Sequence, residues 1–311
     1  MDRSKLLREG AIYLGIYLLL AVITLLIPLI GLFTLFLLPI PFVIYTNKNG
    51  LRPGILLGLI SFFALFLFIG PAALPLTVGF TIGGIVIGEL YRRRKNAFGV
   101  LQGGALAFIA ALLLNFIGSI VLVGVNPINE MQNILHESIE TTEEMLFMFT
   151  FEEEAYLEVV EEFVDLLSYV APTIIIMIGI AFAFIVQWLS SRFLRAKNLE
   201  VSLFPPFREW TFPKAVIWYY LIVYIIILMD IEVGSPLFIV TANLRPLLET
   251  IMLIQGFSFI FFFFHHKNKG ILMPVLIVIV SFILAPVLYL VRIVGIIDLG
   301  FELRKRLNSK K

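Results

Sequence analysis

The stretch TANLRPLLETIMLIQGFSFIFFFFHHKNK, residues 241–269, decides the fold, because it is a long apolar run that ends in lysines. The run begins before this stretch, at Pro236, and reaches Phe264. As one helix it would be about 43 Å long at 1.5 Å per residue, which exceeds a bilayer core of about 30 Å. Such a run requires a membrane, and part of it has to tilt, bend or unwind.

Two charged residues, Arg245 and Glu249, interrupt this run. Counting about 20 residues outward from the lysines places Arg245 near the outer edge of the membrane core. Asn243 is suited to cap a helix start just before it. We therefore predict a helix over 244–265, preceded by an irregular or re-entrant segment that is buried in protein or lines a cavity.

The rest of the chain has the same apolar character. Of its 311 residues, 60% are hydrophobic and 14% are charged, and the mean hydropathy is +1.02, far above that of a soluble domain. These values predict an all-helical polytopic transmembrane bundle with no sizeable soluble domain. Cysteine is absent, which excludes disulfides, thiolate metal sites and a cysteine nucleophile.

Hydropathy predicts nine apolar segments. They are 11–30, 31–46, 53–70, 72–91, 98–124, 169–191, 214–229, 243–265 and 271–291. Most Lys and Arg residues fall in the N-terminus and in alternate connections, so the N-terminus is predicted to be cytoplasmic. Nine crossings would leave the basic tail RKRLNSKK outside, against this rule, so the count stays at eight or nine spans.

The connection over 125–168 holds 12 of the 22 acidic residues and no Lys or Arg. Within it, FEEEAYLEVVEEFVDLL alternates apolar and acidic residues at helical spacing, which predicts an extracytoplasmic amphipathic helix between spans 5 and 6. Its acidic face is interpreted as a solvated cover of the bundle, with a vestibule that concentrates cations as the alternative.

The predicted organisation has six parts. They are the first five spans (1–124), the acidic segment (125–168), the sixth span (169–198), a cytoplasmic interfacial segment (199–213), the C-terminal spans (214–291) and an amphipathic basic tail (292–311). From Arg292 onward, we expect an amphipathic helix at a membrane surface.

Enzyme signatures are missing from the sequence. There is no HExxH, GxSxG or GxxxxGK[ST] motif, and the three histidines have no metal-ligand spacing. We expect no catalytic residue, no metal site and no cofactor.

Small residues four apart predict close helix packing, because they let two backbones approach in lipid. The pairs Gly79 with Gly83 and Gly84 with Gly88 have this spacing, and so do Ala11 and Gly15. The glycine pairs predict tight packing of the fourth and fifth spans. Ala11 and Gly15 could meet another helix of this chain, the interpretation favoured here, or a partner subunit.

The candidate ligand-binding residues are Arg245, Glu249, Asn243 and Asn115. Arg245 and Glu249 share a helix face, so an intrahelical ion pair is the simplest interpretation. A helix start with free N–H groups beside an arginine would also suit an anionic ligand. Asn115 on the fifth span lies at a similar outer depth. At the inner face, Glu89 is expected to pair with the arginines that follow it.

Four stretches carry a family resemblance. REGAIYLGIYLLL, PPFREWTFPKAVIWYY, QGFSFIFFFFHHKN and VRIVGIIDLGFELRKRL together resemble the YybS-like family of bacterial membrane proteins, whose function is uncharacterised. Members look like distant relatives of the S components of energy-coupling-factor transporters and of the rod-shape protein MreD. This resemblance implies an S-component-like bundle for the first spans. It also implies that Ala11 and Gly15 are similar to the surface by which S components contact their transmembrane partner.

We therefore expect a multi-pass plasma-membrane protein, not an enzyme, that binds or transports a small solute from the outer side. Its expected partners are the lipid bilayer, membrane protein subunits and a small-molecule ligand, and not nucleic acid. The alternative is a non-catalytic envelope or cell-shape scaffold acting through protein partners. A third interpretation is a membrane enzyme acting on lipid, with Asp298, Glu302 and Arg292 at an interface.

Overall fold

The computed structural model describes residues 3–146, 154–229 and 231–308. The chain divides into two compact units, Met1–Leu203 (unit 1) and Phe204–Lys311 (unit 2). The regular structure in the described residues is helical, without a strand.

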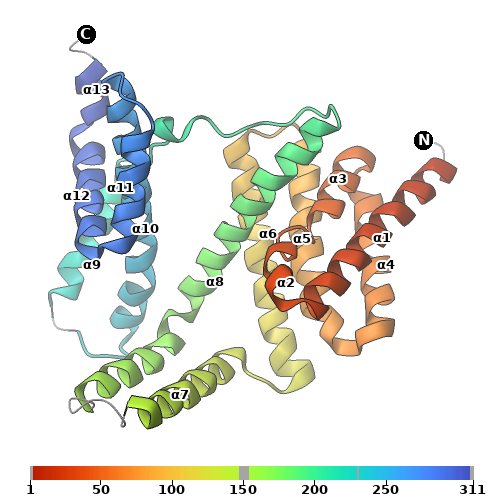
Figure 1. The fold of residues 1–311 in the computed structure, drawn as a ribbon, viewed down its shortest axis with the longest axis horizontal. Coiled ribbons are helices and arrows are strands. Elements are labelled where there is room, and N and C mark those ends of the chain that lie inside the picture. The colour runs from red at the N-terminus through yellow and green to blue at the C-terminus, as the bar shows by residue number, and fades with distance from the viewer. Residues whose placement is uncertain (1–2, 147–153, 230, 309–311) are drawn as a thin grey trace. The chain divides into compact units, whose positions relative to one another are not determined.

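Unit 1 is built around three helices that lie side by side, α5, α6 and α8 (Figure 1). Its helices are α1 (Arg3–Leu26), α2 (Pro28–Thr34), α3 (Ile40–Asn49), α4 (Leu51–Ile69), α5 (Ala73–Arg92), α6 (Ala97–Gly118), α7 (Pro127–Leu146) and α8 (Glu154–Ala196). The turn Gly70–Ala72 joins α4 to α5, and a π-helical turn, Ser119–Val123, extends α6.

Unit 2 is a smaller bundle in which α10 packs against α9, α11 and α12. Its helices are α9 (Ala215–Ile227), α10 (Pro236–His266), α11 (Leu272–Ile283), α12 (Ala285–Phe301) and the short α13 (Leu303–Asn308). A single 3-10 turn, Phe207–Glu209, precedes them.

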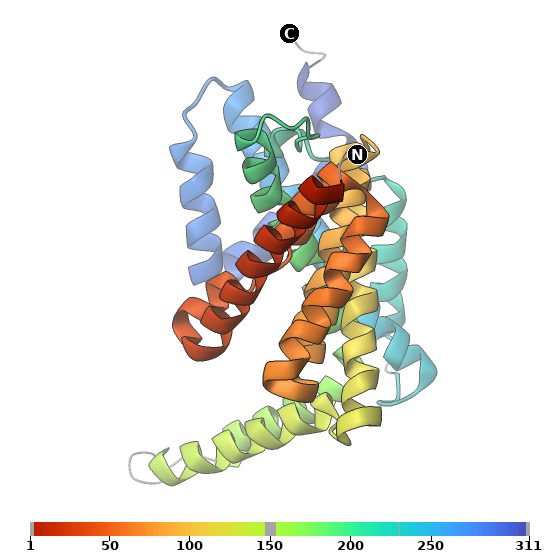
Figure 2. The same cartoon turned by 90° about the vertical axis from the view of Figure 1, so that its right-hand side faces the viewer.

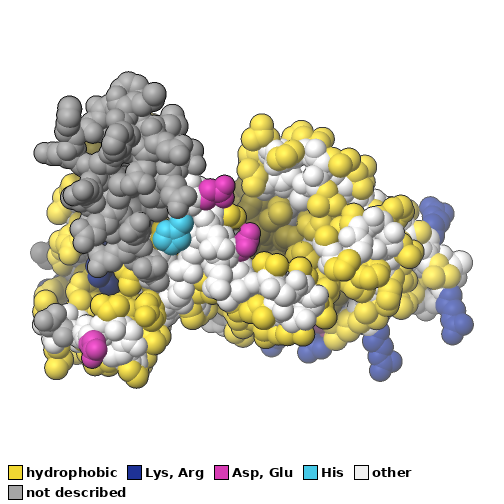
Figure 3. Space-filling model, turned by 90° about the horizontal axis from the view of Figure 1, so that it is seen from below, with side chains coloured by type: hydrophobic (Ala, Val, Ile, Leu, Met, Phe, Trp, Pro, Cys, Tyr) yellow, Lys and Arg dark blue, Asp and Glu magenta, His cyan; other side chains and the backbone are white. Residues whose placement is uncertain are grey.

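Within the described residues, five helical stretches are long and apolar enough to cross a membrane. They are Arg3–Leu26, Leu51–Arg92, Ala97–Val123, Leu166–Ala196 and Pro236–His266, and two shorter apolar helices are Ala215–Ile227 and Leu272–Ile283. Large apolar side chains are widely exposed, among them Leu67 (85%) and Phe68 (80%). Figure 3 shows hydrophobic side chains over much of the described surface, as expected of helices that face lipid.

The glycines of α5 lie at close approaches to two neighbouring helices. An added Cβ would overlap the Phe108 ring of α6 at Gly83, and it would lie 2.6 Å from the Pro39 carbonyl oxygen at Gly84 and 2.5 Å from that of Val43 at Gly88. At Gly79 it would lie 3.1 Å from Asn115 Nδ2 of α6. Gly79 and Gly83 thus face α6, the expected fifth span, as predicted. Gly84 and Gly88 face α3 instead.

The predicted span 31–46 is wrong as a single helix. Its residues fall in α2 and α3, with a break at residues 35–39. Pro39 and Pro41 stand at this break, and proline has no N–H to continue a helical ladder. The Thr24 and Thr34 hydroxyls are 2.7 Å apart, which folds α2 back on α1. At 10 residues, or about 15 Å, α3 is too short to cross the membrane alone.

The helix start predicted near Asn243 is also wrong, because α10 begins at Pro236 and is continuous. Ser235 is the N-cap, and its Oγ accepts the Phe238 N–H at 3.2 Å. The amide of Asn243 donates to the Ile239 carbonyl within the helix (2.8 Å), and Pro246 lies inside the helix. Residues 236–243, which were predicted to form a re-entrant segment, belong to this helix. With 31 residues, α10 is about 46 Å long, so it has to tilt or extend beyond the core.

The predicted span 271–291 divides at Leu284, which is extended (φ −114°, ψ 100°) between α11 and α12. Pro286 lies two residues after Leu284 and fits the first turn of α12. Residues 292–301 therefore continue a helix that begins at Ala285 and packs on α10, and the short α13 follows from Leu303. The prediction that a helix begins at Arg292 is wrong.

The acidic connection forms α7 and the first turns of α8. Figure 2 shows α7 lying across the end of unit 1. The predicted acidic face of FEEEAYLEVVEEFVDLL consists of residues whose side chains lie outside the described part of the chain.

Candidate functional site

Glu249 of α10 contacts polar side chains on three helices. Its Oε1 accepts hydrogen bonds from the Tyr224 hydroxyl of α9 and from Arg245 Nε (3.0 Å), and it forms an ion pair with Arg292 Nη1 of α12 at 2.9 Å. The Arg245–Glu249 pair is the predicted intrahelical ion pair. Arg292 was not predicted to join it, because no local spacing connects two residues so far apart in sequence. We call Tyr224, Arg245, Glu249 and Arg292 the Glu249 cluster.

The Glu249 cluster carries more positive than negative charge. Two guanidinium groups share one carboxylate, and neither has a second acidic partner among the described residues. The side chains of Glu249 and Arg292 are each 18% exposed, whereas Arg245 is 51% exposed. Arg292 Nε is buried and has no hydrogen-bond partner among the described residues, and the Arg292 guanidinium lies 5.3 Å from the centre of the Tyr289 ring. The cluster therefore has donor capacity left for an anion.

The other two predicted ligand-binding residues are used differently. Asn243 lies two residues before Arg245 on α10, and its amide bonds its own helix. Asn115 belongs to unit 1, where its Nδ2 lies 3.5 Å from the Pro75 carbonyl oxygen. The structure therefore assembles Arg245 and Glu249, and it adds Tyr224 and Arg292.

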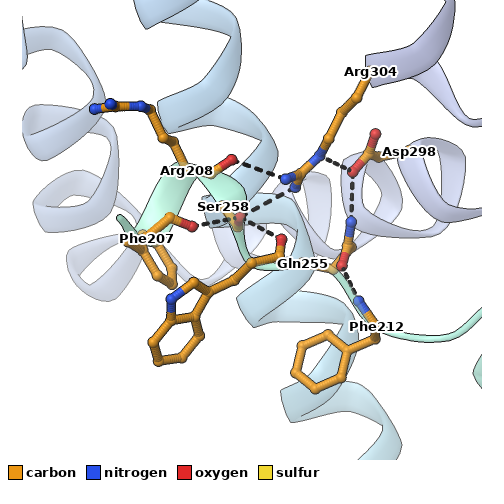
Figure 4. A network of polar contacts seen from close by, with 8 residues as sticks. Phe207, Arg208, Phe212, Gln255, Ser258, Asp298 and Arg304 are labelled. Carbon is orange, nitrogen blue, oxygen red and sulfur yellow. Dashed lines mark hydrogen bonds and ion pairs between the residues drawn. The ribbon is translucent and has the colours of Figure 1, made fainter. Parts of the chain in front are cut away.

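A second polar network lies nearer the other end of α10 (Figure 4). Asp298 Oδ2 of α12 accepts from Gln255 Nε2 (2.5 Å) and from Arg304 Nε (2.9 Å). Arg304 also donates to the Arg208 carbonyl at 2.9 Å and to Ser258 Oγ at 3.1 Å. We call Gln255, Ser258, Asp298 and Arg304 the Arg304 network.

The Arg304 network also holds the segment that precedes α9. Gln255 Oε1 accepts the Phe212 N–H at 3.0 Å, and Ser258 Oγ lies 2.7 Å from the carbonyl oxygens of Phe207 and Trp210. Asp298, Gln255 and Ser258 are almost completely buried. One carboxylate balances one guanidinium, and the buried polar atoms are paired, so this network is structural.

Asp298, Glu302 and Arg292 do not form one site. Arg292 binds Glu249, Asp298 binds Arg304, and Glu302 Oε1 pairs with Lys305 Nζ (2.7 Å) and Lys214 Nζ (3.0 Å). The hydrogen bonds from Lys305 and then Lys214 hold the pKa of Glu302 below its usual value. The arrangement gives no support to the lipid-enzyme interpretation.

Two further predictions concern helix ends and surfaces. Glu89 bonds Arg92 Nε and Arg93 Nε at 2.7 Å each, which confirms the predicted ion pair at the end of α5. Ala11 and Gly15 are exposed on α1, and an added Cβ on Gly15 would meet nothing within 4 Å. In the part of the chain that the structure describes, no group of three or more His, Asp or Glu side chains could hold a metal ion.

The chain has relatives along nearly its whole length. A family model described as "Predicted membrane protein (DUF2232)" matches residues 15–299. The protein described as "Uncharacterized protein YybS" from Bacillus subtilis (strain 168) is 29% identical over 310 residues, which covers 99% of this chain and 100% of that protein. No solved structure matches the chain.

Proposed function

Because the chain belongs to the DUF2232 family of predicted membrane proteins, we propose that it works in the plasma membrane as a multi-pass protein that binds a small anionic solute at the Glu249 cluster. Binding from the outer side would make it a solute-binding or transport protein, without a catalytic step. The solute class follows from the chemistry of the cluster, since paired guanidinium groups recognise carboxylates and phosphates.

The unbalanced charge of the cluster is the observation that carries this proposal. Charged side chains within membrane helices are costly unless they are paired. Here Arg245 and Arg292 share the single carboxylate of Glu249, and in the part of the chain that the structure describes Arg292 Nε has no hydrogen-bond partner. A bound anion would balance the second guanidinium group. It could reach the cluster at Arg245, whose side chain is half exposed.

The position of the cluster along α10 supports access from the outside. Arg245 precedes the helix end at His266 by about 31 Å of helix, close to the thickness of a bilayer core. Lys267 and Lys269 follow that end, and lysines favour the cytoplasmic side.

The hairpins of unit 2 support an inside location of the C-terminal tail. The Arg304 bond to the Arg208 carbonyl holds the tail beside the segment that precedes α9. Arg208, Lys214, Lys305 and Arg306 gather at this end of unit 2, which agrees with the positive-inside rule if both segments are cytoplasmic. If unit 2 crosses the membrane an even number of times, the basic tail RKRLNSKK lies inside. The tail then no longer conflicts with the positive-inside rule.

The experiment measures thermal unfolding of the full chain in lipid nanodiscs with inorganic phosphate, acetate, succinate or citrate added. We expect at least one anion to raise the midpoint in a saturable way, by the equivalent of about 2.7 kcal/mol at 100 times its Kd. Arg292→Gln should lose the shift and still fold, because Arg245 and Glu249 remain as a balanced pair. Arg52→Gln, an exposed arginine outside the cluster, is the matched control.

An equal midpoint shift in wild type and Arg292→Gln would refute binding at this site. No shift with any anion, together with the absence of a copurified anion in mass spectrometry, would also refute the proposal. Copurification with cell-wall or division proteins in that case would favour the scaffold function instead.

A further inference from the structure

A groove of about 630 Å³ lies beside the first turns of α1 in unit 1. It is lined by residues from α1, α3 and the turn after α8, which are Ser4, Lys5, Arg8, Glu9, Ile12, Tyr13, Ile16, Lys48 and Lys197. The Glu249 cluster contributes nothing to it, so the groove has no part in the function proposed above.

One end of the groove is basic beyond what its own carboxylate can balance. Glu9 is paired with Lys48 at 2.6 Å, which neutralises both charges. Lys5 and Arg8 are exposed and have no ion-pair partner among the described residues. Lys197 Nζ donates to the Tyr13 hydroxyl at 2.9 Å, which is a neutral acceptor. Lys5, Arg8 and Lys197 therefore line the groove without an ion pair to a carboxylate among the described residues.

The other end of the groove is apolar. Ile12 and Ile16, one helical turn apart on α1, are 52% and 42% exposed, and Tyr13 beside them is buried. Further along the same helix, Leu19 is 61% exposed. The groove thus passes from a cluster of cations to the apolar surface of a helix that is long enough to cross a membrane.

We propose that this groove binds an anionic phospholipid. The phosphate-bearing head group lies among Lys5, Arg8 and Lys197, and the first part of an acyl chain lies along Ile12 and Ile16. Basic pockets beside membrane helices are suited to such head groups, and each nearby cation adds to the attraction. A free phosphate ester shares the head-group chemistry, but it leaves the exposed isoleucines without a partner.

The experiment is native mass spectrometry of the full chain, released from nanodiscs that contain equal amounts of phosphatidylglycerol and phosphatidylcholine. We expect wild type to retain phosphatidylglycerol in preference to phosphatidylcholine. The Lys5→Gln/Arg8→Gln variant should retain about fivefold less for each charge removed, and adding Lys197→Gln should lower retention again. Neither Lys5 nor Arg8 has a partner that folding depends on, so the double variant should fold as wild type does.

The matched control is Arg52→Gln/Lys95→Gln, which removes two exposed cations of unit 1 that do not line the groove. Retention of phosphatidylglycerol should be unchanged in it. Equal retention by the groove double variant and by wild type would overturn the proposal, and so would an equal loss in the control.

A second arm distinguishes the lipid from a soluble phosphate. Glycerophosphoglycerol, the deacylated head group, and inorganic phosphate are added at millimolar concentration before the measurement. Neither should displace the lipid. Displacement by either at concentrations comparable to the intact lipid would overturn the role of the acyl chain and assign the groove to a soluble phosphate ester. Ile12→Ser/Ile16→Ser should weaken lipid retention and leave the cations in place.

Discussion

Arg292 Nη1 of α12 lies 2.9 Å from Glu249 Oε1 of α10, so a single carboxylate oxygen ties two helices of unit 2 together. The same oxygen also accepts hydrogen bonds from Arg245 Nε and from the Tyr224 hydroxyl. Glu249 is the only acid in this cluster among the described residues. Its removal should therefore destabilise the protein more than the removal of either arginine.

Glu249→Gln should therefore destabilise the protein more than Arg245→Gln or Arg292→Gln. It leaves both guanidinium groups without a carboxylate, and an uncompensated charge on the mostly buried Arg292 side chain costs about 3 kcal/mol. Thermal unfolding in nanodiscs would measure the difference. Glu209→Gln is the control, because the Glu209 side chain is exposed and its one ion pair, with Arg208, is long at 3.9 Å. Equal stability of the Glu249 and Glu209 variants would contradict the role given to Glu249.

Combining Glu249→Gln with Arg292→Gln tests the charge balance directly. The double variant contains one unpaired cation, on the more exposed Arg245. It should be more stable than Glu249→Gln alone, although it differs from wild type at two positions.

The packing of α10 on α12 depends on two glycines, Gly256 and Gly295. A Cβ added to Gly295 would overlap the Met252 carbonyl oxygen, and one added to Gly256 would overlap that of Val291. Gly295→Ala should therefore destabilise unit 2 by about 3 kcal/mol, because backbone cannot move aside as a side chain can. Unfolding in detergent would measure this loss.

Gly300→Ala on the same helix is the matched control. Its Cβ would lie 3.6 Å from Ile217 Cδ1, an ordinary contact, and alanine favours a helix over glycine by about 1 kcal/mol. We expect it to be neutral or stabilising. A similar loss in both variants would show that the close approach of the two backbones does not account for the loss at Gly295.

Local spacing was enough to predict some of these features. Arg245 and Glu249 are four residues apart and do pair, as do Glu89 and Arg93. The regularly spaced glycines of α5 lie at close helix contacts. The ion-paired residues belong to one helix, and the glycines recur at a regular spacing along one helix. Both arrangements can therefore be recognised from the spacing of residues in the sequence.

Features that join distant helices left no such signal. Gly256 and Gly295 are single glycines on different helices, and Arg292 reaches Glu249 only after α11 and α12 have folded back. Asn243 and Ser235 are both good caps, and the sequence alone favoured the wrong one, because a membrane helix longer than the bilayer core was not expected to stay intact.

Glu302 gives a prediction for the dependence of stability on pH. Lys305 and Lys214 lower its pKa in the folded state, so its stabilising effect is present above the unfolded value of about 4.3 and is lost as the pH falls through the lower folded value. The unfolding midpoints of wild type and Glu302→Gln should therefore differ at pH 7 and converge below about pH 4. Glu302 has a left-handed backbone conformation (φ 49°), and glutamine adopts it at the same cost as glutamate. The comparison therefore isolates the effect of the charge. A midpoint difference that is constant between pH 7 and pH 3 would contradict it.

Arg304 should be the residue on which the position of the C-terminal tail depends. Its guanidinium bonds Asp298, Ser258 and the Arg208 carbonyl, and its side chain is only 15% exposed. Arg304→Gln leaves the Asp298 carboxylate buried without a cation, which should cost about 3 to 5 kcal/mol. Brief trypsin digestion should then cut at Arg208 and Lys214 sooner, because the segment before α9 loses the Arg304 bond to the Arg208 carbonyl. Arg306→Gln, two residues further on, should leave the cutting rate at both positions as it is in wild type. If Arg304→Gln and Arg306→Gln are cut at the same rate, the network does not hold this segment.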